Sequence, residues 1–216
     1  MAPQTPQPSD APRHSRGAPL SPGPAALLTV RDLRTYFFAQ DGVVKAVDGA
    51  SFEVHAGKTL GIVGESGCGK SVTARSILGI VERPGRIVGG EIRLGGEDLV
   101  NLDPRGPEMR RIRGGEIGLM FQEPMSSFSP VHTIGNQIEE TIRLHMGLDR
   151  TAARTRAIEM LRMVGVPRPE RRIDEYAFQL SGGLRQRAMI ATALCCQPRI
   201  LIADEPTTAL DVTTQA

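Results

Sequence analysis

Hydrophobic positions in the first part of the chain occur as short runs separated by turn residues. Residues 27–30, 35–38 and 43–47 are rich in aliphatic, aromatic or β-branched side chains, and residues 40–42 form a Gln-Asp-Gly turn between the last two runs. Runs of this kind, bounded by turn signals, predict β-strands. Because strands joined by short connections usually lie beside each other, we expect this region to form an antiparallel sheet.

Four later runs also predict strands. Residues 59–63, 89–94 and 116–121 are short and apolar or β-rich, and residues 200–203, Ile-Leu-Ile-Ala, are apolar throughout. A strand without polar alternation is typical of a parallel sheet that is covered on both faces. A parallel sheet is therefore expected in addition to the antiparallel region.

Apolar residues with helical spacing separate these strands. Residues 71–81 and 184–196 each repeat apolar side chains with the period of a helix, and residues 133–165 contain more than one such face. This order of elements predicts an α/β fold with a parallel sheet, an N-terminal antiparallel β region and an inserted α-helical subdomain at about residues 123–195.

The composition fits one globular domain preceded by a tail. Residues 1–25 are crowded with proline, serine, alanine and glycine and hold few large apolar side chains, so we expect a disordered tail there. The whole chain of 216 residues is 40% hydrophobic, which is enough for one domain, residues 26–216, with a smaller insertion.

Charge and cysteine content argue against several classes of protein. The formal net charge of +2 gives no broad positive field, so nucleic acid is not an expected partner. The cysteines number three, and Cys195 and Cys196 are adjacent in an apolar run, which fits a reducing compartment better than a disulfide framework. No run approaches the roughly 20 apolar residues that cross a bilayer, so any membrane role is expected to come through a partner.

A glycine-rich motif of the pattern G-x-x-x-x-G-K-[ST] lies between a predicted strand and a predicted helix. In this context the pattern indicates a phosphate-binding loop. The glycine backbone of such a loop curls so that N–H groups converge on phosphate oxygens, and the helix N-terminus adds positive potential. Lys70 is expected to place its charge beside the phosphates, and Ser71 to offer its hydroxyl to Mg²⁺. The predicted phosphate cradle comprises Gly64, Glu65, Ser66, Gly67, Cys68, Gly69, Lys70 and Ser71.

Two carboxylates follow the apolar strand at residues 200–203 directly. Asp204 and Glu205 would lie at the C-terminal edge of the parallel sheet, where open α/β sheets bind ligands. We expect Asp204 to hold Mg²⁺ and Glu205 to polarise the attacking water, because phosphoryl transfer requires an oriented nucleophile. Such a pair is often only a solvated strand end, but the phosphate loop upstream favours the functional interpretation.

A second glycine motif points to a family. Ser181 with Gly182 and Gly183 opens a predicted helix whose free N–H groups and dipole can bind an anion, which gives the chain a second phosphate site. The segment resembles the signature motif of the ABC ATPase family, and one helix separates it from the acidic strand as that family requires. It comprises Leu180, Ser181, Gly182, Gly183, Leu184, Arg185, Gln186 and Arg187.

This resemblance covers about residues 27–216 and implies a P-loop NTPase core that binds ATP with Mg²⁺ and hydrolyses it. In the family each ATP lies between the Lys70 loop of one subunit and the signature motif of the other, so Gln186 is included among the predicted nucleotide-binding residues. A helix cap without a ligand is the alternative interpretation of the Ser181 motif.

The resemblance also implies roles for three further residues. Gln122 looks like the Q-loop glutamine, which contacts Mg²⁺ or the attacking water, and Asp211 looks like the D-loop aspartate at the dimer seam. Phe37 aligns best with the aromatic residue that stacks on adenine. Tyr36 and Phe38 remain open for that role, and an aromatic residue of the β core is an equally good interpretation.

The segments around Gln122 and Asp204 are similar to those of the dipeptide and oligopeptide importer branch, which also includes nickel and glutathione importers. That branch implies a second ABC ATPase subunit, identical or related, and integral membrane permease subunits as partners. An extracytoplasmic substrate-binding protein would be an indirect partner. The implied location is the cytoplasmic face of the inner (plasma) membrane, and the sequence leaves the cargo open.

One feature of the family is missing. Its switch histidine lies well beyond the catalytic glutamate, and none of His14, His55, His132 and His145 occupies a comparable position. The chain is therefore expected to be incomplete at its C-terminus, to bind ATP weakly and to hydrolyse it poorly.

Two other functions stay open. A soluble ABC ATPase without a channel usually has a long coiled-coil insertion or a duplicated cassette, and the sequence contains neither. A hydrolysis-deficient nucleotide-binding fragment would fit the missing switch region, but Lys70 and Glu205 argue against it.

Overall fold

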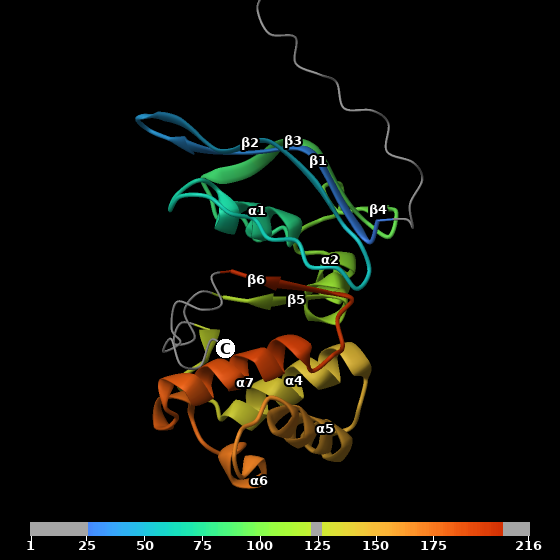
Figure 1. Cartoon of the computed structure of the whole chain (residues 1–216), viewed down its shortest axis with the longest axis vertical. Coiled ribbons are helices and arrows are strands. Elements are labelled where there is room, and N and C mark those ends of the chain that lie inside the picture. The colour runs from blue at the N-terminus through green and yellow to red at the C-terminus, as the bar shows by residue number, and fades with distance from the viewer. Residues whose placement is uncertain (1–25, 122–126, 205–216) are drawn as a thin grey trace, which may run out of the picture.

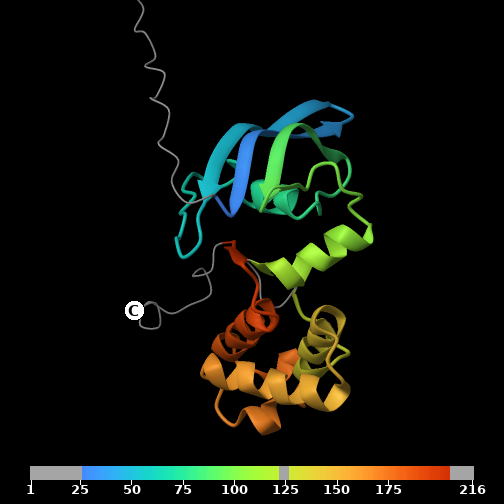
Figure 2. The ribbon, with the colours of Figure 1, turned by 90° about the vertical axis from the view of Figure 1, so that its right-hand side faces the viewer.

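The computed structural model describes residues 26–121 and 127–204, which form a β-rich lobe and a helical lobe (Figure 1). In the side view the curved antiparallel sheet lies at one end, the helices α4 to α7 at the other, and a short parallel sheet between them (Figure 2). Each lobe has its own cluster of buried apolar side chains. The predicted α/β fold with an antiparallel region, a parallel sheet and a helical part is confirmed.

In the described part of the chain the antiparallel sheet contains four strands in the order β2-β1-β3-β4. They are β1 (Leu28–Ala39), β2 (Gly42–Val54), β3 (Gly85–Leu94) and β4 (Glu97–Asp98). The two runs predicted at residues 27–30 and 35–38 form one strand, because a bulge near Asp32, which has φ of 47°, lets the chain continue through the polar stretch between them.

Helix α1 (Lys70–Ile77) packs against the inner face of this sheet (Figure 2) and ends four residues before the predicted run at 71–81 does. Its last turn gives way to Gly79, which adopts φ of 59°, a left-handed conformation that favours glycine and ends the helix. The buried side chains Thr35 on β1 and Ser76 on α1 share a hydrogen bond of 2.8 Å, so strand and helix are held in a fixed relation.

Within residues 26–121 and 127–204 the parallel sheet consists of two strands, β5 (Ile117–Met120) and β6 (Ile200–Ala203), with Ile117 paired to Ile200. Helix α2 (Pro107–Arg111) and the π-helical turn η1 (Ile112–Glu116) lead into β5. The side chain of Ile117 belongs to the core of the β-rich lobe and that of Met120 to the core of the helical lobe. The parallel sheet is therefore the layer at which the two lobes meet.

The strand predicted at residues 59–63 is not formed. All five residues are exposed, and within the described residues none of their backbone N–H or C=O groups makes a backbone hydrogen bond. That prediction was wrong for this structure because a strand needs a neighbour to satisfy its backbone groups, and neither described sheet includes one for this run.

The helical lobe follows the prediction closely. It consists of α4 (Ile134–Met146), α5 (Arg150–Met163), α6 (Pro169–Arg172), the 3₁₀ turn η2 (Ala177–Gln179) and α7 (Gly182–Leu194). Thr133 and Asp149 cap α4 and α5, because each side chain accepts a hydrogen bond from a backbone N–H of the first turn.

Helices α5 and α7 close each other's C-terminal ends. Arg187 on α7 donates hydrogen bonds to the carbonyl oxygens of Val164 and Gly165, at 3.0 and 3.2 Å, just beyond α5. Arg156 on α5 donates to the carbonyl oxygen of Cys195, at 3.4 Å, just beyond α7. Each arginine therefore satisfies carbonyl groups that the other helix leaves free.

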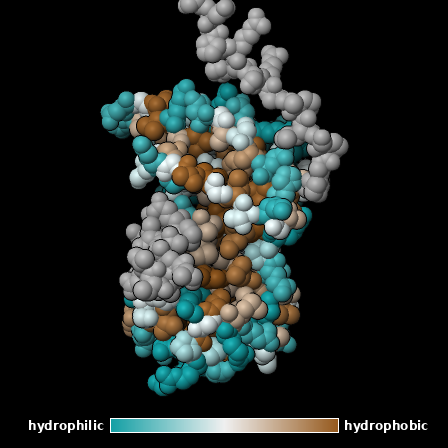
Figure 3. Space-filling model, viewed as in Figure 1, coloured by the Kyte–Doolittle hydropathy of each residue, from teal (hydrophilic) through white to brown (hydrophobic). Residues whose placement is uncertain are grey.

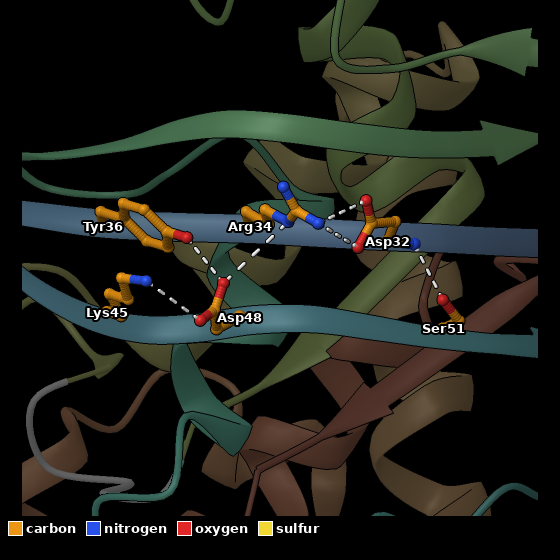
Figure 4. A network of polar contacts seen from close by, with 6 residues as sticks. All are labelled: Asp32, Arg34, Tyr36, Lys45, Asp48 and Ser51. Carbon is orange, nitrogen blue, oxygen red and sulfur yellow. Dashed lines mark hydrogen bonds and ion pairs between the residues drawn. The ribbon is translucent and has the colours of Figure 1, made fainter. Parts of the chain in front are cut away.

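A polar network occupies the outer face of β1 and β2 (Figure 4). The hydroxyl of Tyr36 donates to Asp48 at 2.6 Å, and this hydrogen bond raises the pKa of Tyr36 and lowers the pKa of Asp48. Exposed ion pairs extend the network, whose contribution to stability is small because water screens them. Its members are Asp32, Arg34, Tyr36, Lys45, Asp48 and Ser51.

Among the described residues, no helix is long and apolar enough to cross a membrane.

Candidate functional site

The predicted phosphate cradle, residues 64–71, connects the run at 59–63 to α1. Its glycines are needed where the backbone is tight. Gly69 adopts φ of 95°, and a Cβ there would overlap the backbone carbonyl oxygen of Ala46 on β2. A Cβ on Gly64 would lie 2.5 Å from the sulfur of Cys68. The loop can therefore follow this path only with glycine at position 69, whereas a side chain at position 64 would require the Cys68 side chain to move.

Lys70 lies folded over the loop. Its ammonium group donates hydrogen bonds to the carbonyl oxygens of Gly64 at 2.8 Å and Glu65 at 2.9 Å. These contacts hold a positive charge at the N-terminal end of α1, where the helix dipole is also positive. Cys68 is exposed in the same loop, 3.9 Å from the ammonium nitrogen.

The N-terminus of α1 lacks the side-chain cap that closes the other long helices. Gly69 offers no side chain, and no acidic residue lies in the first turn of α1. The corresponding positions of α4, α5 and α7 are occupied by Thr133, Asp149 and Ser181, which each accept a hydrogen bond from the helix. The first N–H groups of α1 thus remain available for an external anion.

Asp204 directly follows β6, and its backbone N–H donates to the carbonyl oxygen of Met120 at 3.0 Å. Asp204 and Lys70 line one cavity of about 670 Å³. The cation from the loop and the carboxylate from the parallel sheet, far apart in sequence, are thus brought to one place. Ser71 and Asp204 supply hard oxygen donors of the kind that Mg²⁺ prefers, so these residues fit that ion.

The described residues contain no group of three or more side chains that could hold a metal by themselves. Three residues of the predicted site, Gln122, Glu205 and Asp211, lie outside the described ranges, as do residues 1–25 of the predicted tail. Their predicted roles are therefore not tested by the geometry.

The three aromatic candidates on β1 have different surroundings. Phe37 is half-buried and packs on Gly85, where a Cβ would lie 2.7 Å from the Phe37 ring carbon Cε1. The hydroxyl of Tyr36 is bonded to Asp48 on the outer face, and the guanidinium of Arg86 lies 4.2 Å from the centre of the Phe38 ring. Phe37 is thus the one of the three without a polar partner among these contacts.

Ser181 begins α7, and its hydroxyl accepts a hydrogen bond from the N–H of Leu184 at 3.4 Å. Gly182 and Gly183 form the exposed first turn of the helix. Gln186 is buried one turn further on and lines a groove together with Ser181 and Gly183. The first turn is therefore accessible to a ligand, and Gln186 is less accessible than the residues before it.

Comparison with known proteins decides the family. Residues 47–208, which include the predicted phosphate cradle, the Ser181 motif and Asp204, match the ABC transporter family. The chain belongs to this family.

Curated relatives are ATP-binding proteins of peptide transporters. The probable peptide ABC transporter ATP-binding protein y4tR of Sinorhizobium fredii is 53% identical over 191 residues, which are 88% of this chain and 56% of that protein. The oligopeptide transport ATP-binding protein AppD of Bacillus subtilis is 50% identical over 193 residues, or 89% of this chain and 58% of the relative. The dipeptide transport ATP-binding protein DppD of Escherichia coli is 47% identical over 191 residues, 88% of this chain and 58% of the relative. The chain thus spans little more than half the length of these relatives.

Solved ABC cassettes share the fold. A dimeric post-hydrolysis structure of the ATP-binding cassette MJ0796, bound to ADP and Pi, has a TM-score of 0.75 and 29% identity, covering 87% of this chain and 77% of that chain. A second dimeric structure of MJ0796, described as a bacterial ABC transporter cassette, has a TM-score of 0.76 and 29% identity, with coverage of 87% and 78%.

Parts of this ABC cassette's site were not singled out in the sequence. Arg199, directly before β6, lines the cavity and forms an ion pair of 3.3 Å with Glu116. The backbone carbonyl of Ala46 limits the loop at Gly69. Arg199 could have been found from the sequence, because it lies directly before the apolar strand at residues 200–203. The contact of Gly69 with Ala46 arises only from the tertiary fold.

Proposed function

We propose that this chain is the ATP-binding and ATP-hydrolysing subunit of an ABC importer for dipeptides or oligopeptides. The observation that carries the proposal is the convergence of Lys70 and Asp204 on one cavity, at the uncapped N-terminus of α1. A cation, free N–H groups and a carboxylate suited to Mg²⁺ are the groups that a nucleoside triphosphate requires.

In this proposal the substrate is ATP, and the phosphate loop binds its phosphate groups. Lys70 neutralises phosphate charge, and Ser71 and Asp204 hold Mg²⁺, with Gln122 as a further ligand or contact to water. When bound, Mg²⁺ would neutralise charge that develops on the phosphate oxygens. Glu205 orients the attacking water and accepts its proton, and Phe37 stacks on the adenine ring.

The Ser181 motif acts on a second subunit in the same proposal. The exposed first turn of α7, with Ser181, Gly182 and Gly183, would contact ATP held by the partner's phosphate loop, and Asp211 would lie at the seam. The dimeric state of the solved MJ0796 cassettes supports this arrangement. The partner is a second ABC ATPase subunit, identical or related.

The same dimer is proposed to drive permease subunits in the membrane. ATP can shift the dimer from open to closed only by binding the closed form more tightly, because a ligand shifts an equilibrium only through its differential affinity. The subunit would lie at the cytoplasmic face of the inner membrane, with an extracytoplasmic binding protein as an indirect partner. The peptide transport proteins among the relatives support the proposed cargo.

The test measures binding and hydrolysis of ATP with Mg²⁺ by the purified chain, alone and joined to the part of DppD of Escherichia coli that follows the matched region. Lys70→Ala should weaken ATP binding about 10- to 100-fold, the equivalent of one or two hydrogen bonds to a charged group. Lys45→Ala, which removes a lysine of the outer network, is the matched control and should leave ATP binding unchanged.

Glu205→Gln separates binding from hydrolysis. In the joined protein it should abolish turnover, preserve ATP binding and trap a closed dimer, which size-exclusion chromatography would detect. Unchanged turnover of Glu205→Gln would show that the assigned role is wrong, and absence of ATP binding in every form would overturn the proposed function. Binding of ATP without turnover in the joined protein would favour the hydrolysis-deficient alternative.

A further inference from the structure

The helical lobe carries a small pocket lined by arginine side chains. The pocket is formed by α6 and the residues around it, at the opposite end of the molecule from the antiparallel sheet (Figure 1). The surface at this end is mainly hydrophilic (Figure 3). No residue of the pocket belongs to the cavity of Lys70 and Asp204, so the two are separate sites. The pocket is lined by Arg168, Arg171, Arg172 and Glu175.

Two acidic residues next to the pocket are balanced by arginines from outside it. Glu170 pairs with Arg162 of α5. Asp174 pairs with Arg154 of the same helix, with the guanidinium nitrogen and the carboxylate oxygen 2.8 Å apart. Both carboxylates are therefore engaged with α5, and within the described residues neither pairs with an arginine of the pocket.

Glu175 balances only one of the three arginines that line the pocket. Its carboxylate accepts a hydrogen bond from Arg172 at 2.8 Å. The Nε–H of Arg172 is buried and has no acceptor in the described part of the chain, so Glu175 does not satisfy this guanidinium completely. The side chains of Arg168 and Arg171 are exposed, and neither makes a hydrogen bond or an ion pair with another described residue. Like charges gathered in one pocket repel each other, so this arrangement favours an anion between them.

The backbone holds the arginines in place. Arg168 adopts φ of 50° and ψ of 57°, a left-handed conformation that is uncommon for a residue with a side chain and for one that precedes proline. Its carbonyl oxygen accepts hydrogen bonds from the N–H groups of Arg171 and Arg172, both at 3.1 Å, which fixes this turn. Ile173 is fully buried, and its carbonyl oxygen accepts a hydrogen bond from the N–H of Gly135 on α4 at 2.7 Å. The segment is thus fastened to α4, and a strained conformation that the fold maintains is characteristic of ligand sites.

The size of the pocket limits the ligand. Its volume is about 110 Å³, which corresponds to about four water molecules in the liquid. Pockets for drug-sized ligands begin at about 300 Å³, so a nucleotide does not fit, whereas one tetrahedral oxyanion does. Guanidinium groups bind phosphate oxygens through paired N–H donors, which suits arginine to this ligand.

We propose that Arg168 and Arg171, with the Arg172–Glu175 pair beside them, form a binding site for one terminal phosphate group. Arg168 and Arg171 donate N–H groups to its oxygens. Arg172 adds positive potential, and Glu175 keeps the guanidinium of Arg172 in place. The ligand is inorganic phosphate or a phosphate monoester, which includes the headgroup of phosphatidic acid. The inference rests on the arginine pocket and does not depend on the proposed ATP binding.

A phosphate titration of the purified chain tests the site. Backbone amide signals are followed by NMR while inorganic phosphate replaces chloride at constant pH and ionic strength. The readout has to be local, because the Lys70 loop is also expected to bind phosphate. We expect saturable shifts of amides within residues 168–175, in addition to any within residues 64–71. Shifts at residues 168–175 that added chloride reproduces equally would contradict the proposal.

Paired substitutions test whether the pocket is the binding site. Arg168→Gln combined with Arg171→Gln changes exposed side chains, so the chain should keep its fold. This double variant should raise the half-saturating phosphate concentration at residues 168–175 at least about tenfold, because hydrogen bonds to a charged group are lost. Arg143→Gln combined with Arg150→Gln is the matched control, since both arginines are exposed in the same lobe and lie outside the pocket. Equal weakening by the control pair would show that net charge alone acts, and would overturn the site.

The single substitution Arg171→Gln replaces the double variant if thermal unfolding shows that the double variant does not fold. It should weaken phosphate binding at residues 168–175 about tenfold, and unchanged binding would overturn the role of Arg171.

Vesicles distinguish the two sources of the phosphate group. Phosphatidylcholine vesicles with and without phosphatidic acid are sedimented with the unmodified chain and with both double variants. Binding to phosphatidic acid that only the substitutions at Arg168 and Arg171 remove would show that the site accepts a lipid headgroup. Shifts with soluble phosphate and no such vesicle binding would restrict the site to soluble phosphates. Absence of both effects would overturn the proposal, whether or not the chain binds ATP.

Discussion

The hydroxyl groups of Thr35 and Ser76 lie 2.8 Å apart in the core between β1 and α1. Ser76 donates its single hydroxyl hydrogen to the carbonyl oxygen of Val72 at 2.7 Å, so Thr35 is the donor in the bond that they share. The pair joins the strand that holds Phe37 to the helix that follows the phosphate loop.

Replacing Thr35 with valine keeps the shape of the side chain and removes the donor. Thr35→Val should lower the free energy of unfolding by about 1–2 kcal/mol, because a buried acceptor loses its partner. In a double-mutant cycle with Ser76→Ala, urea titrations should give a coupling energy of about 1 kcal/mol. Additive effects of the two substitutions would contradict the shared bond.

Gly69 and Gly67 offer a matched pair of substitutions in the phosphate loop. Both adopt positive φ, 95° and 82°, but a Cβ on Gly69 meets the carbonyl oxygen of Ala46, whereas one on Gly67 has nothing within 4 Å. Gly67→Ala should cost about 1–2 kcal/mol of stability from the backbone conformation alone. Gly69→Ala should cost about 3 kcal/mol or more, because β2 must move as well. Thermal unfolding measures both, and equal losses would rule out the clash.

Ser181 and Thr133 cap the helices α7 and α4 in the same way. Comparing substitutions at the two positions therefore separates the loss of a helix cap from an effect on ATP hydrolysis. Ser181→Ala and Thr133→Ala should each lower stability by about 1 kcal/mol. Only Ser181→Ala should also lower ATP turnover of a complete dimer, by about tenfold, the equivalent of one hydrogen bond to a charged phosphate. If Thr133→Ala lowers ATP turnover equally, the loss of turnover in Ser181→Ala comes from the lost helix cap and not from a lost contact with ATP.

The free energy of unfolding should depend on pH through His145. Its ring packs against Gly114 and Gly115 in a groove with Arg110, Arg111, Arg113 and Glu116, and burial lowers its pKa. A lowered pKa means that the unfolded chain binds the proton more tightly, so stability should fall as the pH drops below about 6.5, the ordinary histidine value.

The lowered pKa values of Asp48 and Glu170 act in a different range, since carboxylates lose their contribution only near and below about pH 4. Urea titrations between about pH 5 and 7 should therefore isolate the histidine. His145→Asn should flatten the profile in this window, and an unchanged slope would contradict the role of His145.

The sequence predicted the helices of the helical lobe because the signals of a helix are local. Helix α4 begins directly after Thr133, where the region predicted as helical starts, whereas the break before α5 at Asp149 was not predicted. The run at residues 59–63 has the composition of a strand, yet strand formation depends on a partner that composition does not report. The contact of Gly69 with Ala46 and the shared cavity of Lys70 and Asp204 join distant parts of the chain, which no local pattern contains. The roles of Gln122, Glu205 and Asp211 stay predictions.

Reciprocal closure of helix ends by Arg156 and Arg187 has a mechanical consequence. Sliding α5 along α7 by one turn would break contacts at both ends together, so shear within the helical lobe is resisted from two points. We therefore expect α5 and α7 to move together when Ser181 is displaced, and residues 195–199 join α7 directly to β6 and Asp204.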